Sequence, residues 1–362
     1  MNLFYVVVFG IFFAFNLFVG GIFYIFFPSK FTKILLWALP IAGPLFILLS
    51  FAVNRRSEGY FGGLIAMLGH YWTGILGILV FIGIVMILAF VVLSLFKIPS
   101  IYWIGRTGLA FMVVFTLLGI MGGQTAPVVR QIDIKSPHLP VDKLKIVQIS
   151  DTHLGTGVRV KRVRDMVKEI NAQEPDIIVV TGDFFENGNK LVEKNANALK
   201  HMKAKYGIYG TLGNHEFYRG LKQSTHFFEK AGVELLRQQT VRPLPGVAVS
   251  GLDDFSTAHI SKADFGRFLD GLNKNEFNII LQHEPKYYDV AQGKMDLMLS
   301  GHTHDGQIFP FRYLVKTRYP HVYGLYQKGR SSFYVTSGVF YWGPPMRLFS
   351  RNEIAVFNIE KE

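Results

Sequence analysis

The sequence predicts a bundle of membrane-spanning helices followed by a soluble α/β domain built around a layered sheet. Half of the 362 residues are hydrophobic, which is more than an ordinary soluble enzyme carries. This excess lies before about residue 125, where Glu58 is the only acidic residue. From Val128 onward the charge density is that of a globular domain, and short β-branched runs alternate with helical stretches. Such alternation is typical of α/β proteins.

Four apolar stretches in the N-terminal part have lengths suited to a bilayer, which needs about 20 residues per helix. They cover residues 3–27, 34–53, 72–96 and the shorter 107–121. The first lacks the basic region and the small-residue cleavage site of a signal peptide, so all four are expected as retained helices. The sequence therefore predicts a transmembrane helical region over residues 1–122.

The membrane orientation is not determined by charge, because alternate loops carry about equal numbers of lysine and arginine. An even number of spans places the N-terminus and the soluble domain on one side. We expect a multi-pass protein of the bacterial cytoplasmic (inner) membrane whose soluble domain faces the cytoplasm. No acidic residue lies within a span, and His70 is the only histidine of the bundle, so an anchor is favoured over a transporter.

The overall charge and the cysteine content limit the possible functions. Solubility and positive loops beside a membrane account for the formal net charge of +12, with anionic head groups or a phosphorylated substrate as the alternative. Nucleic-acid binding is not expected, because no basic run is interleaved with aromatics on a nucleic-acid module. The chain has no cysteine, which excludes disulfides, zinc–thiolate sites and cysteine nucleophiles.

A linker over residues 123–143 is expected to lead into the soluble domain, residues 144–362. Helices are predicted at residues 160–172 and 191–203. Strands are predicted at residues 144–150, 176–181, 207–212, 247–251, 278–282, 297–300, 333–336 and 354–359. Short buried runs separated by helices are typical of strands in a sheet covered by helices.

Polar motifs follow five of these strands. Open α/β sheets bind ligands at the carboxyl ends of their strands, so the five motifs are expected to converge. Two divalent ions about 3.5–4 Å apart need a bridging carboxylate with oxygen and imidazole ligands around it. Each motif alone occurs by chance, but the five in this order predict a two-metal site. They are Asp151-Thr152-His153, Gly182-Asp183, Gly213-Asn214-His215-Glu216, Gln282-His283-Glu284 and Gly301-His302-Thr303-His304.

This motif set resembles the calcineurin-like metallophosphoesterase superfamily across essentially the whole soluble domain. Later motifs, Gly306-Gln307-Ile308 and Trp342-Gly343-Pro344-Pro345, are similar to the bacterial membrane-associated branch that includes the YaeI and YkuE phosphodiesterases. The resemblance implies a layered β-sandwich flanked by helices. It implies that Asp151, His153 and His304 hold one ion, that Asn214, His283 and His302 hold the other, and that Asp183 bridges both.

The resemblance also implies hydrolysis of a phosphodiester or pyrophosphate bond by a metal-activated hydroxide. Asn214 is expected to offset charge on the phosphoryl oxygens, and His215 to stabilise the transition state or protonate the leaving oxygen. Manganese is the favoured metal, with iron, zinc or nickel as alternatives. Phe184 and Phe185 replace the continuation found in protein Ser/Thr phosphatases, which argues against phosphoprotein substrates. Asp305 stands where this branch commonly has glycine.

The substrate is expected to be a membrane-lipid precursor similar to UDP-2,3-diacylglucosamine, because one helix would suffice for a simple anchor. Candidate substrate contacts are Arg312, Trp342 and Arg347, although ordinary loop packing or a surface salt bridge also explains these residues. One alternative is a general phosphodiesterase or phosphatase on soluble nucleotides or cell-wall phosphates, merely tethered to the membrane. A second is a metal-dependent binding module without activity. No protein partner is inferred.

Overall fold

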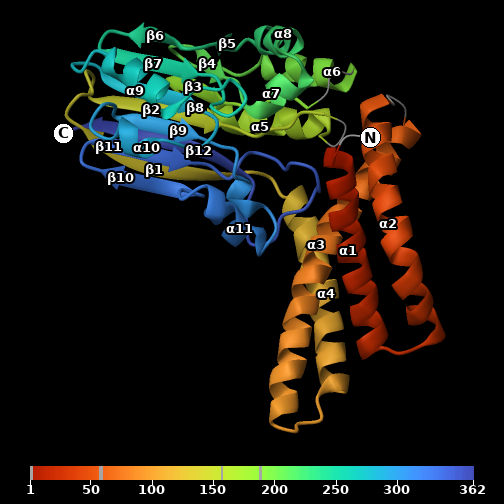
Figure 1. Cartoon of the computed structure of the whole chain (residues 1–362). Helices are drawn as coiled ribbons and strands as arrows, with labels where there is room; N and C mark the ends of the chain where they lie inside the picture. Colours follow the sequence, from red (N-terminus) through yellow and green to blue (C-terminus); the bar gives the residue numbers. More distant parts are fainter. Residues whose placement is uncertain (1–2, 57–59, 156–157, 187–189) are drawn as a thin grey trace. The chain divides into compact units, whose positions relative to one another are not determined.

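A computed structural model describes residues 3–56, 60–155, 158–186 and 190–362. The chain forms two compact units (Figure 1). The helical unit consists of residues 1–124 together with two later segments, Ile308–Pro310 and Gly343–Phe349. The sheet unit consists of Thr125–Gln307, Phe311–Trp342 and Ser350–Glu362.

The helical unit contains four long apolar helices, as the sequence predicts. They are α1 (Leu3–Phe26), α2 (Lys30–Arg56), α3 (Tyr60–Leu95) and α4 (Ile101–Gln124). Each is long and apolar enough to cross a membrane. Helices α3 and α4 begin earlier than predicted, because the Gly- and Tyr-containing stretches before residues 72 and 107 continue the helices rather than end them. Glycine is tolerated in membrane helices, where it is more frequent than in soluble ones.

The two later segments pack within the helical unit. Ile308, Met346 and Leu348 are buried in one cluster with side chains of α1, α3 and α4. The Arg347 N–H donates to the Gly119 carbonyl at 2.8 Å, and a Cβ on Gly122 would lie 2.3 Å from the Arg347 carbonyl oxygen. Close approach of this kind requires glycine on the helix. The unit that contains the four candidate membrane helices therefore includes two loops from the C-terminal half of the sequence.

The sheet unit contains two six-stranded sheets. The first has the order β1 (Val128–Ser136), β12 (Glu353–Lys361), β2 (Lys143–Ile149), β3 (Ile177–Thr181), β4 (Ile208–Thr211) and β5 (Glu234–Leu235). The second has the order β10 (Gly324–Lys328), β11 (Ser331–Val335), β9 (Leu297–Ser300), β8 (Phe277–Gln282), β7 (Val247–Leu252) and β6 (Gln239–Leu244). Strands β2 to β5 are parallel, as are β7, β8, β9 and β11.

Helices cover the outer face of each sheet. The inner faces bury one cluster that includes Ile146, Val179 and Leu281. The first sheet is covered by α5 (Val160–Ala172), α6 (Lys190–Leu199), α7 (Asn214–Arg219) and α8 (Leu221–Ala231). The second is covered by α9 (Lys262–Asp270) and α10 (Tyr288–Ala291), and the turn η1 (His304–Gly306) and α11 (Phe311–Arg318) follow β9. This arrangement confirms the predicted layered β-sandwich flanked by helices.

Residues 128–136, expected as part of a linker, instead form β1. This strand pairs in parallel with β12 along its full length, from Val128 opposite Glu353 to Ser136 opposite Lys361. Ile132 and Ile134 are buried while Gln131 and Asp133 between them are exposed. One face of β1 is buried and the other is exposed, so apolar residues alternate with polar ones and the stretch resembles an exposed segment in the sequence.

Candidate metal centre

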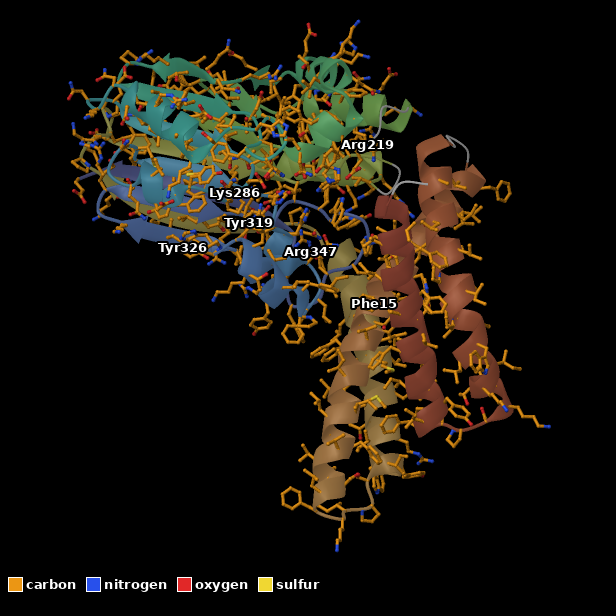
Figure 2. The ribbon with its side chains drawn as sticks, viewed as in Figure 1. Phe15, Arg219, Lys286, Tyr319, Tyr326 and Arg347 are labelled. Carbon is orange, nitrogen blue, oxygen red and sulfur yellow. The ribbon has the colours of Figure 1, made fainter. Side chains whose placement is uncertain are left out.

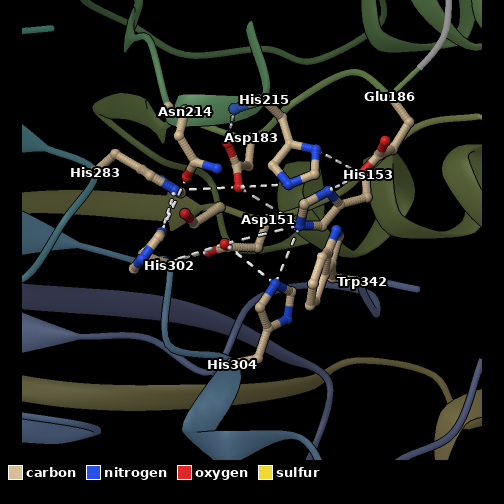
Figure 3. Close-up of polar contacts among 12 residues, drawn as sticks. Asp151, His153, Asp183, Glu186, Asn214, His215, His283, His302, His304 and Trp342 are labelled. Atoms are coloured by element: carbon tan, nitrogen blue, oxygen red, sulfur yellow. Dashed lines mark hydrogen bonds and ion pairs between the residues drawn. The ribbon is translucent and has the colours of Figure 1, made fainter. Parts of the chain in front are cut away.

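The structure brings all five sequence motifs together at the carboxyl ends of β2, β3, β4, β8 and β9 (Figure 3). Asp151 and His153 follow β2, Asp183 follows β3, and Asn214 and His215 follow β4. His283 follows β8 directly, and His302 and His304 follow β9. The prediction that strand ends would converge is therefore correct, because these strands run parallel in each sheet.

One group of possible metal ligands consists of Asp151, His153 and His304. The His304 Nε2 atom lies 3.4 Å from the Asp151 Oδ1 atom and 3.1 Å from the His153 Nε2 atom. All three side chains are buried. Two imidazole nitrogens at this separation repel one another unless a proton or a cation lies between them.

A second group consists of Asp183, His283 and His302. The His283 Nε2 atom lies 3.1 Å from the Asp183 Oδ2 atom and 3.2 Å from the His302 Nδ1 atom. The Asn214 Oδ1 atom lies 3.0 Å from the same His302 nitrogen. This second group therefore combines one carboxylate, one amide oxygen and two imidazoles.

Asp183 is the residue that the two groups share. Its Oδ2 atom lies 3.1 Å from the His283 Nε2 atom and 3.7 Å from the His153 Nε2 atom. Burial by itself would raise the pKa of Asp183, but the nearby His283, His215 and His153 lower it well below its usual value. The carboxylate is therefore ionised and faces ligands of both groups.

The donor set fits divalent cations. In three of the histidines one ring nitrogen is hydrogen-bonded to an outer partner, so the other nitrogen faces the candidate metal centre. His283 donates from Nδ1 to the Thr181 carbonyl at 2.8 Å, which leaves Nε2 as the available lone pair. His153 is held in the same way at Nδ1 by Glu186 at 2.7 Å. His302 uses Nε2 toward the Tyr319 hydroxyl at 2.9 Å, which leaves Nδ1 available. Metal-binding histidines commonly have such outer partners.

Glycines next to the ligands provide space for the carboxylates. A Cβ on Gly213 would lie 2.2 Å from the Asp183 Oδ1 atom, and a Cβ on Gly301 would lie 2.1 Å from the Asp151 Oδ2 atom. Of Gly182, Gly213 and Gly301, only Gly182, at φ +84°, needs glycine for its backbone conformation. Five of the ligand residues themselves have positive φ, which is uncommon outside functional sites. They are Asp151, His153, Asp183, His302 and His304.

Glu186, which follows Phe184 and Phe185 in the chain, is a site residue that the sequence motifs did not predict. Its Oε1 atom lies 2.7 Å from the His153 Nδ1 atom and 2.9 Å from the His215 Nδ1 atom. Its Oε2 atom accepts from Arg219 at 3.0 Å. Burial would raise the pKa of Glu186, but hydrogen bonds from both histidines lower it well below its usual value. One carboxylate thus orients a ligand imidazole and His215.

His215 lies beside the candidate metal ligands and close to two exposed aromatic rings. Its ring centroid is 5.6 Å from that of Tyr218 and 5.9 Å from that of Trp342, which are 67% and 53% exposed. Burial would lower the pKa of His215, but Asp183 and Glu186 outweigh it and raise this pKa to about 9. An imidazole in this setting carries a proton at neutral pH.

Glu216 holds the loops of the site through its buried carboxylate. It accepts hydrogen bonds from the backbone N–H groups of Gly213 (2.7 Å), Asp183 (2.9 Å), Phe184 (2.8 Å) and Phe185 (3.2 Å). Burial and the charge of Asp183 raise the pKa of Glu216 to about 7. The last residue of the Gly213–Glu216 motif is therefore structural and joins the loops after β3 and β4.

Replacing Glu216 with alanine is expected to destabilise the sheet unit by several kcal/mol. Four backbone N–H groups would lose their acceptor, and each buried unsatisfied group costs about 1–3 kcal/mol. Thermal unfolding in detergent, followed by the circular dichroism of the full chain, measures the effect. The matched control is Glu229→Ala on the exposed face of α8, which should leave the unfolding temperature unchanged.

The three predicted substrate contacts lie in different surroundings. Trp342 is beside His215, and its backbone pairs with the Gln307 side chain at 2.9 Å. Arg312 forms an ion pair with Asp305 at 2.8 Å. Arg347 is only 1% exposed and belongs to the helical unit, so a surface salt bridge does not explain it. These three residues stay predictions as substrate contacts.

Asp305 adopts the backbone conformation that favours glycine, with φ +54°. The Asp305 carboxylate forms an ion pair with Arg312 in the first turn of α11. Aspartate is among the side chains that tolerate this conformation best. The residue therefore joins the turn that carries His304 to the helix that follows.

Tyr319 is a second site residue that the sequence analysis did not assign to the metal centre. Its hydroxyl lies 2.9 Å from the His302 Nε2 atom and donates to the Glu284 Oε1 atom at 2.8 Å. Removing this hydroxyl by Tyr319→Phe is expected to weaken binding of one metal ion by about tenfold, since loss of an outer partner typically costs 10–100-fold. Metal titration with elemental analysis measures this. Tyr313→Phe, an exposed tyrosine of α11, is the matched control, and equal affinities in both variants would contradict the role.

Comparisons with known proteins agree with this geometry. The sequence profile described as calcineurin-like phosphoesterase matches residues 144–306. An uncharacterized metallophosphoesterase of Campylobacter jejuni is 35% identical over 65% of this chain and 63% of its own length. YkuE, an uncharacterized metallophosphoesterase of Bacillus subtilis, is 32% identical over 63% of this chain and 83% of its own length.

A relative with membrane segments in its name is also similar. The bovine transmembrane protein with metallophosphoesterase domain is 32% identical over 69% of this chain and 61% of its own length. The match to the first curated relatives, from Campylobacter and Helicobacter, spans 63% of their length. The matched profile covers the five ligand motifs of the sheet unit. The chain belongs to the calcineurin-like metallophosphoesterase family.

Proposed function

We propose that the protein hydrolyses a phosphodiester or pyrophosphate bond of a membrane-lipid precursor, similar to UDP-2,3-diacylglucosamine. The observation that carries this proposal is the packing of two site-flanking loops within the membrane-spanning unit. Ile308–Pro310 follows the turn that carries His304, and Gly343–Phe349 follows Trp342. A simple tether would need neither loop in its core. Chain segments that leave the metal centre and enter a membrane helix bundle are suited to a substrate held in the bilayer.

The proposed metal ligands follow from the two groups described above. When bound, two divalent ions lower the pKa of water and offset charge on the phosphoryl oxygens. The mixed oxygen and imidazole ligands suit manganese, with iron, zinc or nickel as alternatives. Asp151, His153 and His304 would hold one ion, Asn214, His283 and His302 would hold the other, and Asp183 would be a ligand of both.

His215 is the proposed proton donor to the leaving oxygen. Glu186 holds its Nδ1 atom at 2.9 Å, so the Nε2 atom, 4.0 Å from Asp183, is the one directed toward the reacting groups. The exposed rings of Tyr218 and Trp342, both near His215, are suited to pack against an apolar or planar leaving group. General acids of this kind typically contribute 10²–10⁴-fold to the rate.

The proposed location is a bacterial cytoplasmic membrane with the sheet unit facing the cytoplasm, where nucleotide-linked lipid precursors are made. Narrower membership of the membrane-associated branch that includes YaeI stays part of this proposal.

The test is hydrolysis by the full-length protein in detergent with manganese, comparing UDP-2,3-diacylglucosamine with bis-p-nitrophenyl phosphate. Preferential cleavage of the lipid, lost in Asp183→Ala and His215→Ala, is the expected result. Cleavage of bis-p-nitrophenyl phosphate, with no cleavage of any lipid phosphodiester or pyrophosphate in a series, would favour a tethered enzyme with a soluble substrate. No cleavage of any substrate by a protein that binds two ions would favour a binding module.

A further inference from the structure

Helix α11 exposes apolar side chains on nearly all sides. None of its residues, Phe311–Arg318, is buried. Tyr313 and Leu314 are each 64% exposed, and Phe311 is 39% exposed. A short helix with this much exposed aromatic and aliphatic surface is unusual for the outside of a soluble domain.

The charge of α11 is entirely positive. The segment FRYLVKTR contains Arg312, Lys316 and Arg318 and no acidic residue. Lysine and arginine side chains attract anionic lipid head groups, and tyrosine favours the boundary between lipid and water. The composition of the helix therefore suits an anionic membrane surface better than a soluble partner with an acidic patch, which would leave the apolar side chains in water.

The chain enters α11 directly from the helical unit. Pro310 is the last residue of the segment that packs within that unit, and Phe311 is the first residue of the helix. One residue earlier, the Phe309 ring lies 5.2 Å from that of Phe81, which belongs to the candidate span Phe61–Leu95. Consecutive Cα atoms are about 3.8 Å apart, so the start of α11 is tied to a segment that packs against membrane-spanning side chains.

Polar contacts join both ends of α11 to the loop that carries two metal ligands. Near its start, Arg312 pairs with Asp305, the neighbour of His304. Just after its end lies Tyr319, which is labelled in Figure 2, and its hydroxyl is 2.9 Å from the His302 Nε2 atom. Both histidines of the Gly301–His304 motif are therefore adjacent to a residue held by this helix.

We propose that α11 lies in the head-group layer of an anionic bilayer and anchors the His302–His304 loop to the membrane surface. The apolar rings and Leu314 enter the boundary region, and Lys316 and Arg318 contact lipid phosphates. This inference rests on the membrane anchorage of the proposed function and gives its metal centre a fixed position at the surface where a lipid phosphate would be. The contact of α11 with lipid would therefore serve to position the metal centre, and not only to attach the protein to the membrane.

The absence of cysteine allows a direct test, because one introduced cysteine can be labelled uniquely. The full-length Leu314→Cys variant, labelled with an environment-sensitive fluorophore, is placed in nanodiscs of phosphatidylcholine with phosphatidylglycerol. Ala263→Cys on the exposed surface of α9 is the matched control. The expected result is a blue shift of the label at position 314 and quenching by nitroxide lipids, with neither effect at position 263. A label at position 314 that reports water, as at position 263, would overturn the proposal.

Charge is tested in the same labelled protein. Lys316→Glu combined with Arg318→Glu is expected to return the emission of the label toward its value in water, whereas Lys222→Glu on α8 should not. Equal burial of the label in pure phosphatidylcholine nanodiscs would overturn the assignment to anionic lipid. The readout needs no substrate. A buried label in a protein that does not cleave lipid counts against the proposed substrate and not against the α11 contact. An exposed label in a protein that cleaves lipid counts against the α11 contact and not against the proposed substrate.

Discussion

Replacing Asp183 with asparagine is expected to remove at least one metal ion per chain and nearly all hydrolytic activity. The Asp183 Oδ2 atom faces His283 at 3.1 Å and His153 at 3.7 Å, and its Oδ1 atom accepts the backbone N–H of His215 at 2.9 Å. Asparagine keeps the shape of the side chain but loses the negative charge between the two ligand groups. The rate should fall well beyond the roughly 10–100-fold typical for losing an outer partner of a ligand.

Elemental analysis of the purified variant and hydrolysis of bis-p-nitrophenyl phosphate measure these two effects separately. Asp165→Asn, on the exposed surface of α5, is the matched control and should retain both ions and full activity. A variant at Asp183 that retains two ions per chain would show that the two groups do not share this ligand. An Asp183→Asn variant that is folded, has an unchanged unfolding temperature and binds no ions would most directly support a ligand shared by the two groups.

The convergence of the five motifs could be predicted from the sequence because each follows a short apolar strand of a parallel sheet. Their partners could not be predicted in this way. Glu186 lies three residues after Asp183 and is separated from His215 by β4, so its contact with both His153 and His215 exists only in the folded chain. Tyr319 reaches His302 from the end of a separate helix. Outer partners of this kind depend on tertiary packing rather than on spacing along the chain.

The glycines show a different limit. A glycine directly before a ligand at a strand end usually permits a tight turn, but of the glycines before Asp183, Asn214 and His302 only Gly182 has a positive φ. Gly213 and Gly301 have ordinary φ values, and glycine is required there because a carboxylate of another loop approaches within 2.2 and 2.1 Å of where a Cβ would lie. A sequence shows that a residue is small but not what approaches it.

The packing of the two loops within the helical unit also lay outside sequence reasoning. The four spans were identified from apolar length, and the match to the observed helices is good except at the starts of α3 and α4. Ile308 and Met346 lie in short apolar stretches next to prolines, and their contacts with helices more than 180 residues earlier leave no periodic pattern in the sequence. The burial of such loops depends on tertiary contacts with distant helices, so it cannot be predicted from the local sequence.

A chain that begins at Thr125 is expected to fold poorly and to lose most of its activity toward even a soluble diester. Ile308, Met346 and Leu348 are buried by helices that this chain would lack. Exposing an apolar side chain costs about 1.5–3 kcal/mol, so three of them approach the total stability of a typical domain, about 5–15 kcal/mol. The segments before α11 and after Trp342 would also lose the helices on which they pack, and they directly follow Gln307 and Trp342 in the chain. Size-exclusion chromatography and hydrolysis of bis-p-nitrophenyl phosphate measure the two losses.

A triple replacement distinguishes packing from a general effect of truncation. Ile308→Ser, Met346→Ser and Leu348→Ser should raise the solubility of the chain that begins at Thr125, because the exposed residues become polar. In the full-length protein the same three changes should lower the unfolding temperature, because the same positions are buried in the helical unit. A gain in solubility of the truncated chain together with a lower unfolding temperature of the full-length protein is the result expected if these loops are part of the core of the helical unit. A monomeric truncated chain with undiminished activity would instead reduce the four helices to a tether and leave the metal centre as the only catalytic part of the fold.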